Sequence, residues 1–61
     1  MIDINDVFIN VERPQTLRVL SYTRLDFEQE CYCLMEYKGD CWNESHMAYF
    51  IEKYYTKMES L

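Results

Sequence analysis

The last third of the chain, from Trp42 to Leu61, has the apolar spacing of an amphipathic helix, and this pattern most constrains what so short a chain can fold into. Its apolar residues follow the i, i+3, i+4, i+7, i+11 and i+14 spacing of one helical face. They are Met47, Phe50, Ile51, Tyr54, Met58 and Leu61. Asn43 suits the N-cap, and Glu44 suits the positive end of the helix dipole. Because a chain of 61 residues can barely build one core, we expect a helix over residues 43–60 to cover it.

Two segments near the N-terminus alternate apolar and polar residues, as half-buried strands do. In residues 6–12 every second residue is valine or isoleucine. Pro14, which has no backbone donor, then favours a turn. Pro14 can also open a helix, but the apolar residues after it do not form a helical stripe. We therefore expect a β-hairpin with strands at about 6–12 and 16–23.

Residues 26–38 carry helix signals at both ends. Asp26 suits the N-cap, Gln29 stands at the N3 position of a capping box, and Gly39 stands where a helix commonly ends. We therefore expect a second helix over residues 26–38, with a strand as the competing interpretation. The expected fold class is α+β: a single small domain over residues 1–61, with an N-terminal β-hairpin packed on two helices. The alternative is a three-stranded antiparallel sheet with one C-terminal helix.

The sequence indicates a cytoplasmic protein, or one of the host cytoplasm if the protein is viral. The first ten residues carry acids where a secretion signal needs positive charge. No segment approaches the roughly 18 apolar residues of a membrane span. Three cysteines are an odd number, which argues against a disulfide framework.

The net charge of −5 is concentrated in one third of the chain. Residues 26–44 contain six acids and a single base, Lys38, whereas the other five acids are balanced by five bases. A protein that binds a phosphate backbone needs a basic footprint, so we expect no direct binding to nucleic acid and none to membranes. The complementary partner is a basic protein.

An acidic, tyrosine-bearing surface is the predicted binding site. On the expected helix, Glu28, Tyr32 and Glu36 recur every four residues and so share one face. Tyrosine gives a large contact area at low entropic cost, and carboxylates pair with Lys and Arg. The predicted partner-binding residues are Asp26, Glu28, Glu30, Tyr32, Glu36, Tyr37, Asp40 and Glu44. The alternative is a solvated helix face that only keeps the protein soluble.

These features predict a small binding protein that inhibits or modulates a basic, nucleic-acid-handling protein. Spaced carboxylates on a rigid element can imitate a row of phosphates, so the protein would be a nucleic-acid mimic in one version of this hypothesis. In size and charge alone, the chain resembles viral host-takeover and anti-defence inhibitors. We expect no enzyme activity and no catalytic residues, because the motifs around known catalytic cysteines are missing and a short chain hardly encloses a substrate pocket.

A zinc-stabilised domain is one alternative function. Cys31, Cys33, Cys41 and His46 form a C-x-C-x7-C-x4-H series, and three sulfurs with one imidazole are a permitted zinc shell. Structural sites typically place two to four residues between paired cysteines, more than separate Cys31 from Cys33. On a helix these two side chains also point about 200° apart. We therefore assign no metal and no other cofactor.

A structural subunit that forms a homodimer is the other alternative. Aromatic residues make up 16% of the chain, a high share for its length. Ala48, Tyr49 and Tyr55 flank the apolar face of the expected last helix and could widen that face into a dimer seam.

Overall fold

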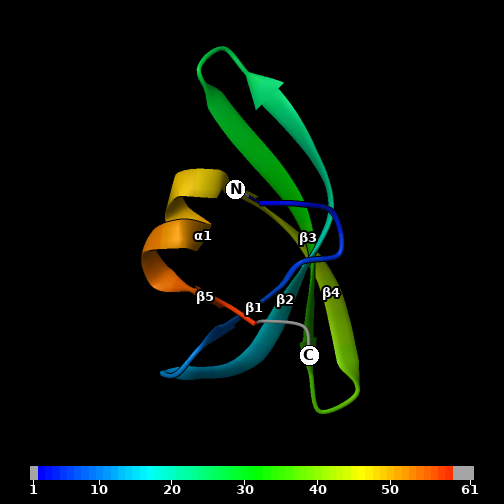
Figure 1. Ribbon diagram of the computed structural model, residues 1–61. Helices are drawn as coiled ribbons and strands as arrows, with labels where there is room; N and C mark the ends of the chain where they lie inside the picture. Colours follow the sequence, from blue (N-terminus) through cyan, green and yellow to red (C-terminus); the bar gives the residue numbers. More distant parts are fainter. Residues whose placement is uncertain (1, 59–61) are drawn as a thin grey trace.

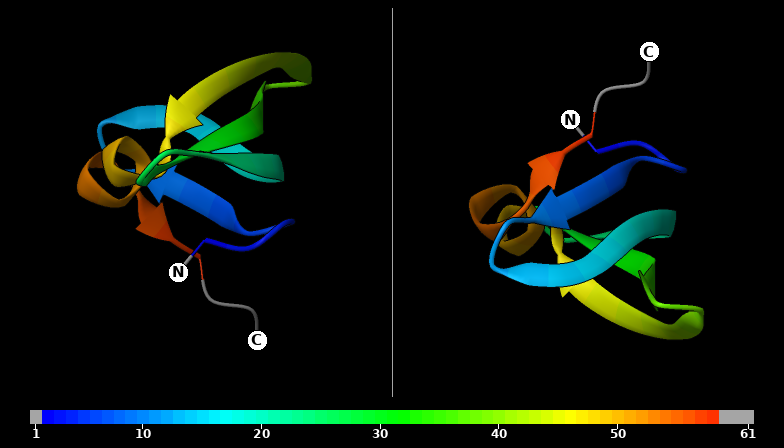
Figure 2. Two further views of the ribbon diagram at one scale, coloured as in Figure 1. Left: turned by 90° about the horizontal axis from the view of Figure 1, so that it is seen from above. Right: turned by 90° about the horizontal axis from the view of Figure 1, so that it is seen from below.

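The structure, a computed structural model, describes residues 2–58 as one curved antiparallel sheet with a short helix (Figure 1). The first four strands are neighbours in chain order: β1 (Val7–Asn10), β2 (Arg13–Leu25), β3 (Glu28–Tyr37) and β4 (Asp40–Met47). The helix α1 (Ala48–Tyr54) follows, and then β5 (Thr56–Lys57). Because β5 returns to pair with β1, the strand order is β4-β3-β2-β1-β5. Figure 2 shows the sheet curling, with α1 against one end of it.

The expected hairpin packed on two helices is therefore wrong. The segment 26–38, expected to be a helix, is a turn followed by β3. Of the expected helix 43–60, only residues 48–54 are helical; residues 43–47 belong to β4, residues 55–58 follow α1, and residues 59–60 lie outside the described residues. The alternative of an antiparallel sheet with one helix fits the structure, although the sheet has more strands than expected. The predicted hairpin corresponds to β1 and β2, but its turn lies at residues 11–12, before Pro14.

The buried residues of β3 alternate along the chain, as they do in a strand. Cys31 and Cys33 are fully buried and Met35 nearly so, whereas Tyr32 and Glu36 between and beside them are exposed. On a helix, Cys33 would point about 200° away from Cys31, out of the core. Only the two-residue period of a strand buries all three of these side chains at once.

The residues interpreted as helix ends are instead hairpin turns. Lys38 and Gly39 have φ of 48° and 86°, the two positive values that a type I′ turn requires, and this turn joins β3 to β4. Asp26, expected to cap a helix, has φ of 54° in the two-residue turn between β2 and β3. At Gly39 a helix end and this turn both need a positive φ. At Asp26 they share only the residue type, because aspartate suits an N-cap and also tolerates the left-handed region of a turn.

Pro14 lies inside β2 without disturbing the sheet. The register between β1 and β2 shifts after Ile9, whose partner is Thr16, and this irregularity leaves Pro14 outside the ladder. Pairing of β2 with β3 also begins only at Thr16. The missing N–H of Pro14 therefore costs no sheet hydrogen bond.

The helix α1 is only one part of the segment expected to be helical. It begins after Met47, which makes no side-chain capping hydrogen bond, and Asn43 and Glu44, expected at the helix start, lie in β4 instead. Its Ala48 and Ile51 are buried. α1 is the one helix among residues 2–58, and it is too short to cross a membrane.

The core lies between the inner side of the sheet and α1. It consists of Ile2, Phe8, Leu17, Val19, Cys31, Cys33, Met35, Ala48, Ile51 and Tyr55.

At the edge of this core, Lys57 Nζ lies 3.2 Å from Asp6 Oδ2, and the same Oδ2 accepts the backbone N–H of Asp3 at 2.8 Å. The hydrogen bond from Asp3, together with Lys57, holds the pKa of the Asp6 carboxyl below its ordinary value. This ion pair fastens β5 to the segment before β1.

Candidate protein-binding surface

The outer side of β3 carries a row of glutamates and a tyrosine. Successive side chains of a strand point to opposite sides of the sheet, and Cys31, Cys33 and Met35 point inward. The even-numbered residues therefore point outward, and we call four of them the acidic stripe: Glu28, Glu30, Tyr32 and Glu36. At about 3.3 Å per residue, the stripe extends over roughly 26 Å.

The glutamates of the stripe have no ionic partner within the described part of the chain. The two ion pairs found among residues 2–58 are His46 with Glu44, and Lys57 with Asp6. Cross-strand neighbours of the stripe are all uncharged and mostly short; they are Thr16, Ser21, Thr23, Leu25, Cys41, Ser45 and Met47. The base on this part of the outer side is Arg18, opposite Leu34. The stripe is therefore a row of negative charge that an external cation can reach.

The structure keeps part of the predicted surface together and separates the rest. Asp26 lies in the turn that leads into the stripe, whereas Asp40 begins β4 at the opposite end of β3. Tyr37 and Glu44 point to the core side of the sheet, in register with residues on that side. Asp40 is in register with Tyr37 and so lies on that side too. The predicted surface therefore narrows to the acidic stripe, with Asp26 at one end.

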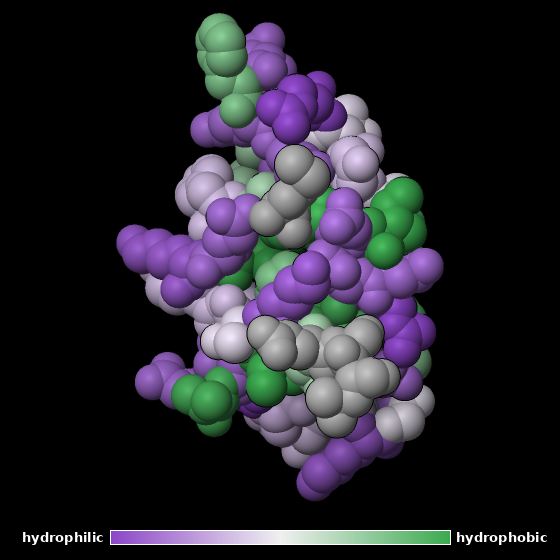
Figure 3. All heavy atoms as spheres, in the orientation of Figure 1, coloured by the Kyte–Doolittle hydropathy of each residue, from purple (hydrophilic) through white to green (hydrophobic). Residues whose placement is uncertain are grey.

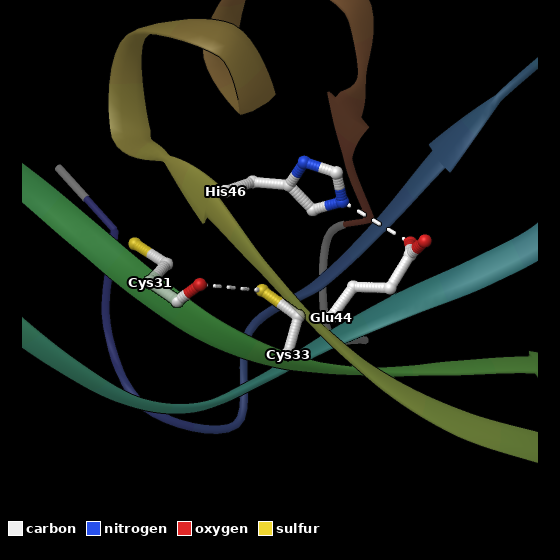
Figure 4. A network of polar contacts seen from close by, with 4 residues as sticks. All are labelled: Cys31, Cys33, Glu44 and His46. Atoms are coloured by element: carbon white, nitrogen blue, oxygen red, sulfur yellow. Dashed lines mark hydrogen bonds and ion pairs between the residues drawn. The ribbon is translucent and has the colours of Figure 1, made fainter.

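Glu44 belongs to a separate polar cluster on the inner side of the sheet (Figure 4). Its Oε2 lies 3.2 Å from His46 Nε2, and the His46 ring stacks on Phe50 with a centroid separation of 5.2 Å. Beside this pair, the Cys33 thiol donates a hydrogen bond to the Cys31 carbonyl at 3.6 Å. Burial, with Cys31 and Glu44 nearby, raises the pKa of the Cys33 thiol to about 12. A free thiol with this pKa stays protonated at neutral pH, so it is a poor nucleophile.

The four residues of the zinc alternative do not converge. Cys31 and Cys33 point into the core, and His46 lies opposite Cys31 in the ladder. Cys41 is exposed and stands in register with Glu36 on the outer side. Among residues 2–58, no group of three or more His, Cys, Asp or Glu side chains is placed to hold a metal ion. The donor set therefore does not fit zinc.

The residues of the predicted dimer seam do not form one surface either, because two of them are buried and one is exposed. Ala48 and Tyr55 are buried in the core of their own chain, where they are unavailable to a second copy. Tyr49 remains 63% exposed. An isolated exposed tyrosine is ordinary on a protein surface, so this seam is not continuous.

A projecting arm is the feature that sequence reasoning missed. β1 pairs with β2 only as far as Arg18, and β4 pairs with β3 only from Glu30 onward, so residues 20–29 form a two-stranded ribbon that extends from the sheet (Figure 1). Phe27 at its turn is 99% exposed and Leu25 is 49% exposed. Figure 3 shows apolar atoms at the tip of this arm. The usual hairpin signal, a glycine in the turn, is missing from Asp26-Phe27.

Comparison of the chain with family models, curated proteins and solved structures finds no match. The stripe and the arm are adjacent, because Glu28 belongs to both and Glu30 directly follows the arm. Charge, exposed aromatic surface and an open strand are thus found together in one part of the molecule.

Proposed function

We propose that the protein is a small binding module that inhibits or modulates a basic, nucleic-acid-handling protein through the acidic stripe. One observation carries this proposal: three glutamates without ionic partners among the described residues and an exposed tyrosine point to the same side of one strand. Like charges that share one side of a strand repel one another, and a partner with Lys and Arg side chains removes that repulsion.

Tyr32 is the expected centre of the contact. Its side chain is 42% exposed, and its ladder neighbours on the two sides are Ser21 and Ser45. These neighbours are short, so the ring stands clear of them and offers area to a partner. Tyrosines in such positions are common binding hot spots when charged residues surround them and exclude water.

The charge of the stripe selects the class of partner. Alternate residues of a strand are about 6.6 Å apart, so the stripe presents carboxylates in a line to the Lys and Arg side chains of a partner. A protein that binds nucleic acid has a surface of such side chains. Occupying that surface would block its nucleic acid, which gives the module an inhibitory effect.

Neutralising the stripe tests the proposal. In the variant Glu28→Gln/Glu30→Gln/Glu36→Gln the net charge falls from −5 to −2 (−5 + 3). The matched control Asp3→Asn/Glu12→Gln/Glu52→Gln has the same net charge and changes exposed acids elsewhere. Tagged wild-type protein is used to isolate the partner from cells, and its affinity for all three proteins is then measured at several salt concentrations.

We expect the stripe variant to bind the partner about tenfold more weakly, since three exposed charge pairs at about 0.5 kcal/mol each amount to about 1.5 kcal/mol. The control should keep the wild-type affinity within about twofold. Equal affinities of the stripe variant and the control would contradict the proposal. Competition between the wild-type protein and duplex DNA for the isolated partner then tests whether the module occupies the nucleic-acid site.

A further inference from the structure

The edge of β2 in the projecting arm is open. Val19 is the last residue of β2 that bonds to the N-terminal part of the chain: its carbonyl accepts the N–H of Asn5 at 2.7 Å and its N–H donates to the Asp6 carbonyl at 3.0 Å. No strand within residues 2–58 pairs with the following residues on that side. Residues 20–25 therefore form a sheet edge with unpaired backbone groups.

The direction of each backbone group follows from the pairing. Val19 points its N–H and carbonyl away from β3, and the register shift between Val19 and Ser21 adds one residue to β2. Because these groups alternate in direction along a strand, those of Tyr22 and Arg24 point to the open edge. Two donors and two acceptors thus face outward over a short length of strand.

Beyond the irregularity at its start, this edge has neither the prolines nor the several charges that usually protect sheet edges. Native proteins place prolines or several charges on exposed edges to prevent added strands. β4, the long edge on the other side of the sheet, carries Asp40, Glu44 and His46. Residues 20–25 carry Arg24 alone and expose apolar side chains; the exposed fractions are 37% for Leu20, 47% for Tyr22 and 49% for Leu25. A two-stranded ribbon is also marginally stable in water and gains from a third strand.

The net charge of the arm determines which kind of strand can be added to its open edge. Residues 20–30 contain three acids and Arg24, a net charge of −2 (−3 + 1). Two copies of the arm would bring like charges together, whereas a strand with Lys or Arg would neutralise them. Ser21 and Thr23 stand opposite Tyr32 and Glu30 in the ladder. Because both are short, a lysine on an added strand can extend across them to Glu30.

We propose that residues 20–25 bind an extended, lysine- or arginine-rich segment of the partner as an added β-strand. This inference rests on the proposed function and specifies how the basic partner is held. Backbone hydrogen bonds to Tyr22 and Arg24 supply affinity, and Glu28 and Glu30 select basic residues at alternate positions. Phe27 provides an apolar contact at the tip of the arm.

A model peptide tests this mode of binding directly. The probe is a labelled decapeptide that alternates lysine and valine, and the matched control alternates glutamate and valine. Fluorescence anisotropy measures affinity, and hydrogen exchange measures protection of individual amides. We expect saturable binding of the lysine peptide, at least tenfold weaker binding of the glutamate peptide, and slower exchange at the amides of Tyr22 and Arg24. Methylating alternate peptide nitrogens removes the donors of the added strand, so it should abolish binding without any change to the protein.

Two variants at one position separate the edge from the charge. Arg24→Pro removes the outward N–H, whereas Arg24→Ala removes the same side chain and keeps the N–H. We expect Arg24→Ala to bind the lysine peptide at least as tightly as the wild type, because it removes a like charge, and Arg24→Pro to bind about tenfold more weakly. Thermal melting of both variants shows whether either substitution destabilises the fold. If Arg24→Pro does, the methylated peptide tests the added strand on the unchanged protein instead.

Each outcome separates this inference from the proposed function. Equal binding by Arg24→Pro and Arg24→Ala, or undiminished binding of the methylated peptide, would overturn the added strand. If Glu28→Gln/Glu30→Gln/Glu36→Gln loses the partner and Arg24→Pro keeps it, the proposed function stands without strand addition. If neither variant loses the partner, both fall. A dimer at micromolar concentration with protected amides at Tyr22 and Arg24 in the absence of peptide would assign the edge to a second copy and overturn the proposal.

Discussion

At the scale of single residues, the three cysteines have different surroundings and therefore different reactivity. Cys31 and Cys33 have no exposed surface, and burial raises the pKa of both thiols. Cys41 is exposed on the outer side of β4. Because the thiolate is the reactive form and needs access to the reagent, reactivity should follow this division.

We expect one thiol in three to react rapidly with a disulfide reagent at pH 8 in the folded protein, and all three in denaturant. Cys41→Ser should remove the rapid reaction while leaving the two slow ones. Absorbance of the thiolate released from the reagent measures the rates of the rapid and the slow reactions. Rapid reaction of two or three thiols below the melting temperature would contradict the buried positions of Cys31 and Cys33.

Asp6 should make the stability of the protein depend on pH. Its pKa is lowered in the folded state by the N–H of Asp3 and by Lys57, so its contribution is fully present above the ordinary aspartate pKa of about 3.9 and is lost as the pH falls through the folded-state value. We expect Asp6→Asn to lower the free energy of unfolding at pH 7 by roughly 1 kcal/mol. Urea titrations from pH 7 to pH 2.5 should show that the difference in unfolding free energy between the wild type and Asp6→Asn becomes smaller. A difference that grew on acidification would contradict a lowered pKa of Asp6 in the folded state.

At the scale of elements, local patterns identified some strands and missed others for physical reasons. The alternation predicted both β1 and β2 as strands, and in β2 it also marked the buried side, where Leu17 and Val19 lie. In β1 the buried residue is instead Phe8, whereas Val7 and Ile9 are half-buried and Val11 is exposed. In β3 the buried side is marked by two cysteines and a methionine, and Asp26 and Gly39 suit helix ends as well as hairpin turns. β4 is a strand because it pairs with β3 along its whole length, and pairing between segments is not a local property.

Part of the candidate site was predictable because a spacing of four residues is common to both structures. Residues four apart lie on one side of a helix, and they also lie on one side of a strand, where any even spacing does. Glu28, Tyr32 and Glu36 therefore share a surface although the predicted helix is wrong. The arm was not predictable, because its open edge depends on where β1 stops pairing with β2.

The turn between β3 and β4 offers a test of its type. Lys38 has φ of 48°, a conformation in which asparagine is more favourable than lysine. We expect Lys38→Asn to stabilise the protein by about 0.5 kcal/mol. Gly39→Ala should destabilise it by about 1 kcal/mol through backbone strain alone, because a Cβ there meets no atom within 4 Å. Chemical denaturation of both variants measures the two changes, and a neutral Gly39→Ala would argue against the type I′ turn.

At the scale of the whole molecule, stability depends on a small number of buried side chains. Leu17 is fully buried at the centre of β2, and truncating such a leucine costs about 2–5 kcal/mol. A domain of this size has a total stability of about that amount. We therefore expect Leu17→Ala to be largely unfolded at 25 °C by circular dichroism. The control Leu20→Ala, at a partly exposed position of the same strand, should remain folded; similar losses from both would mean that the core is not where the structure places it.

The pairing of β5 with β1 also determines when the fold can be completed. Phe8 is in register with Lys57, so the two partners are separated by nearly the whole chain, whereas β1 to β4 pair with near neighbours in sequence. Closing so long a loop costs more entropy than closing a hairpin. During synthesis, the edge of β1 that pairs with β5 therefore stays without its partner until residue 57 has left the ribosome.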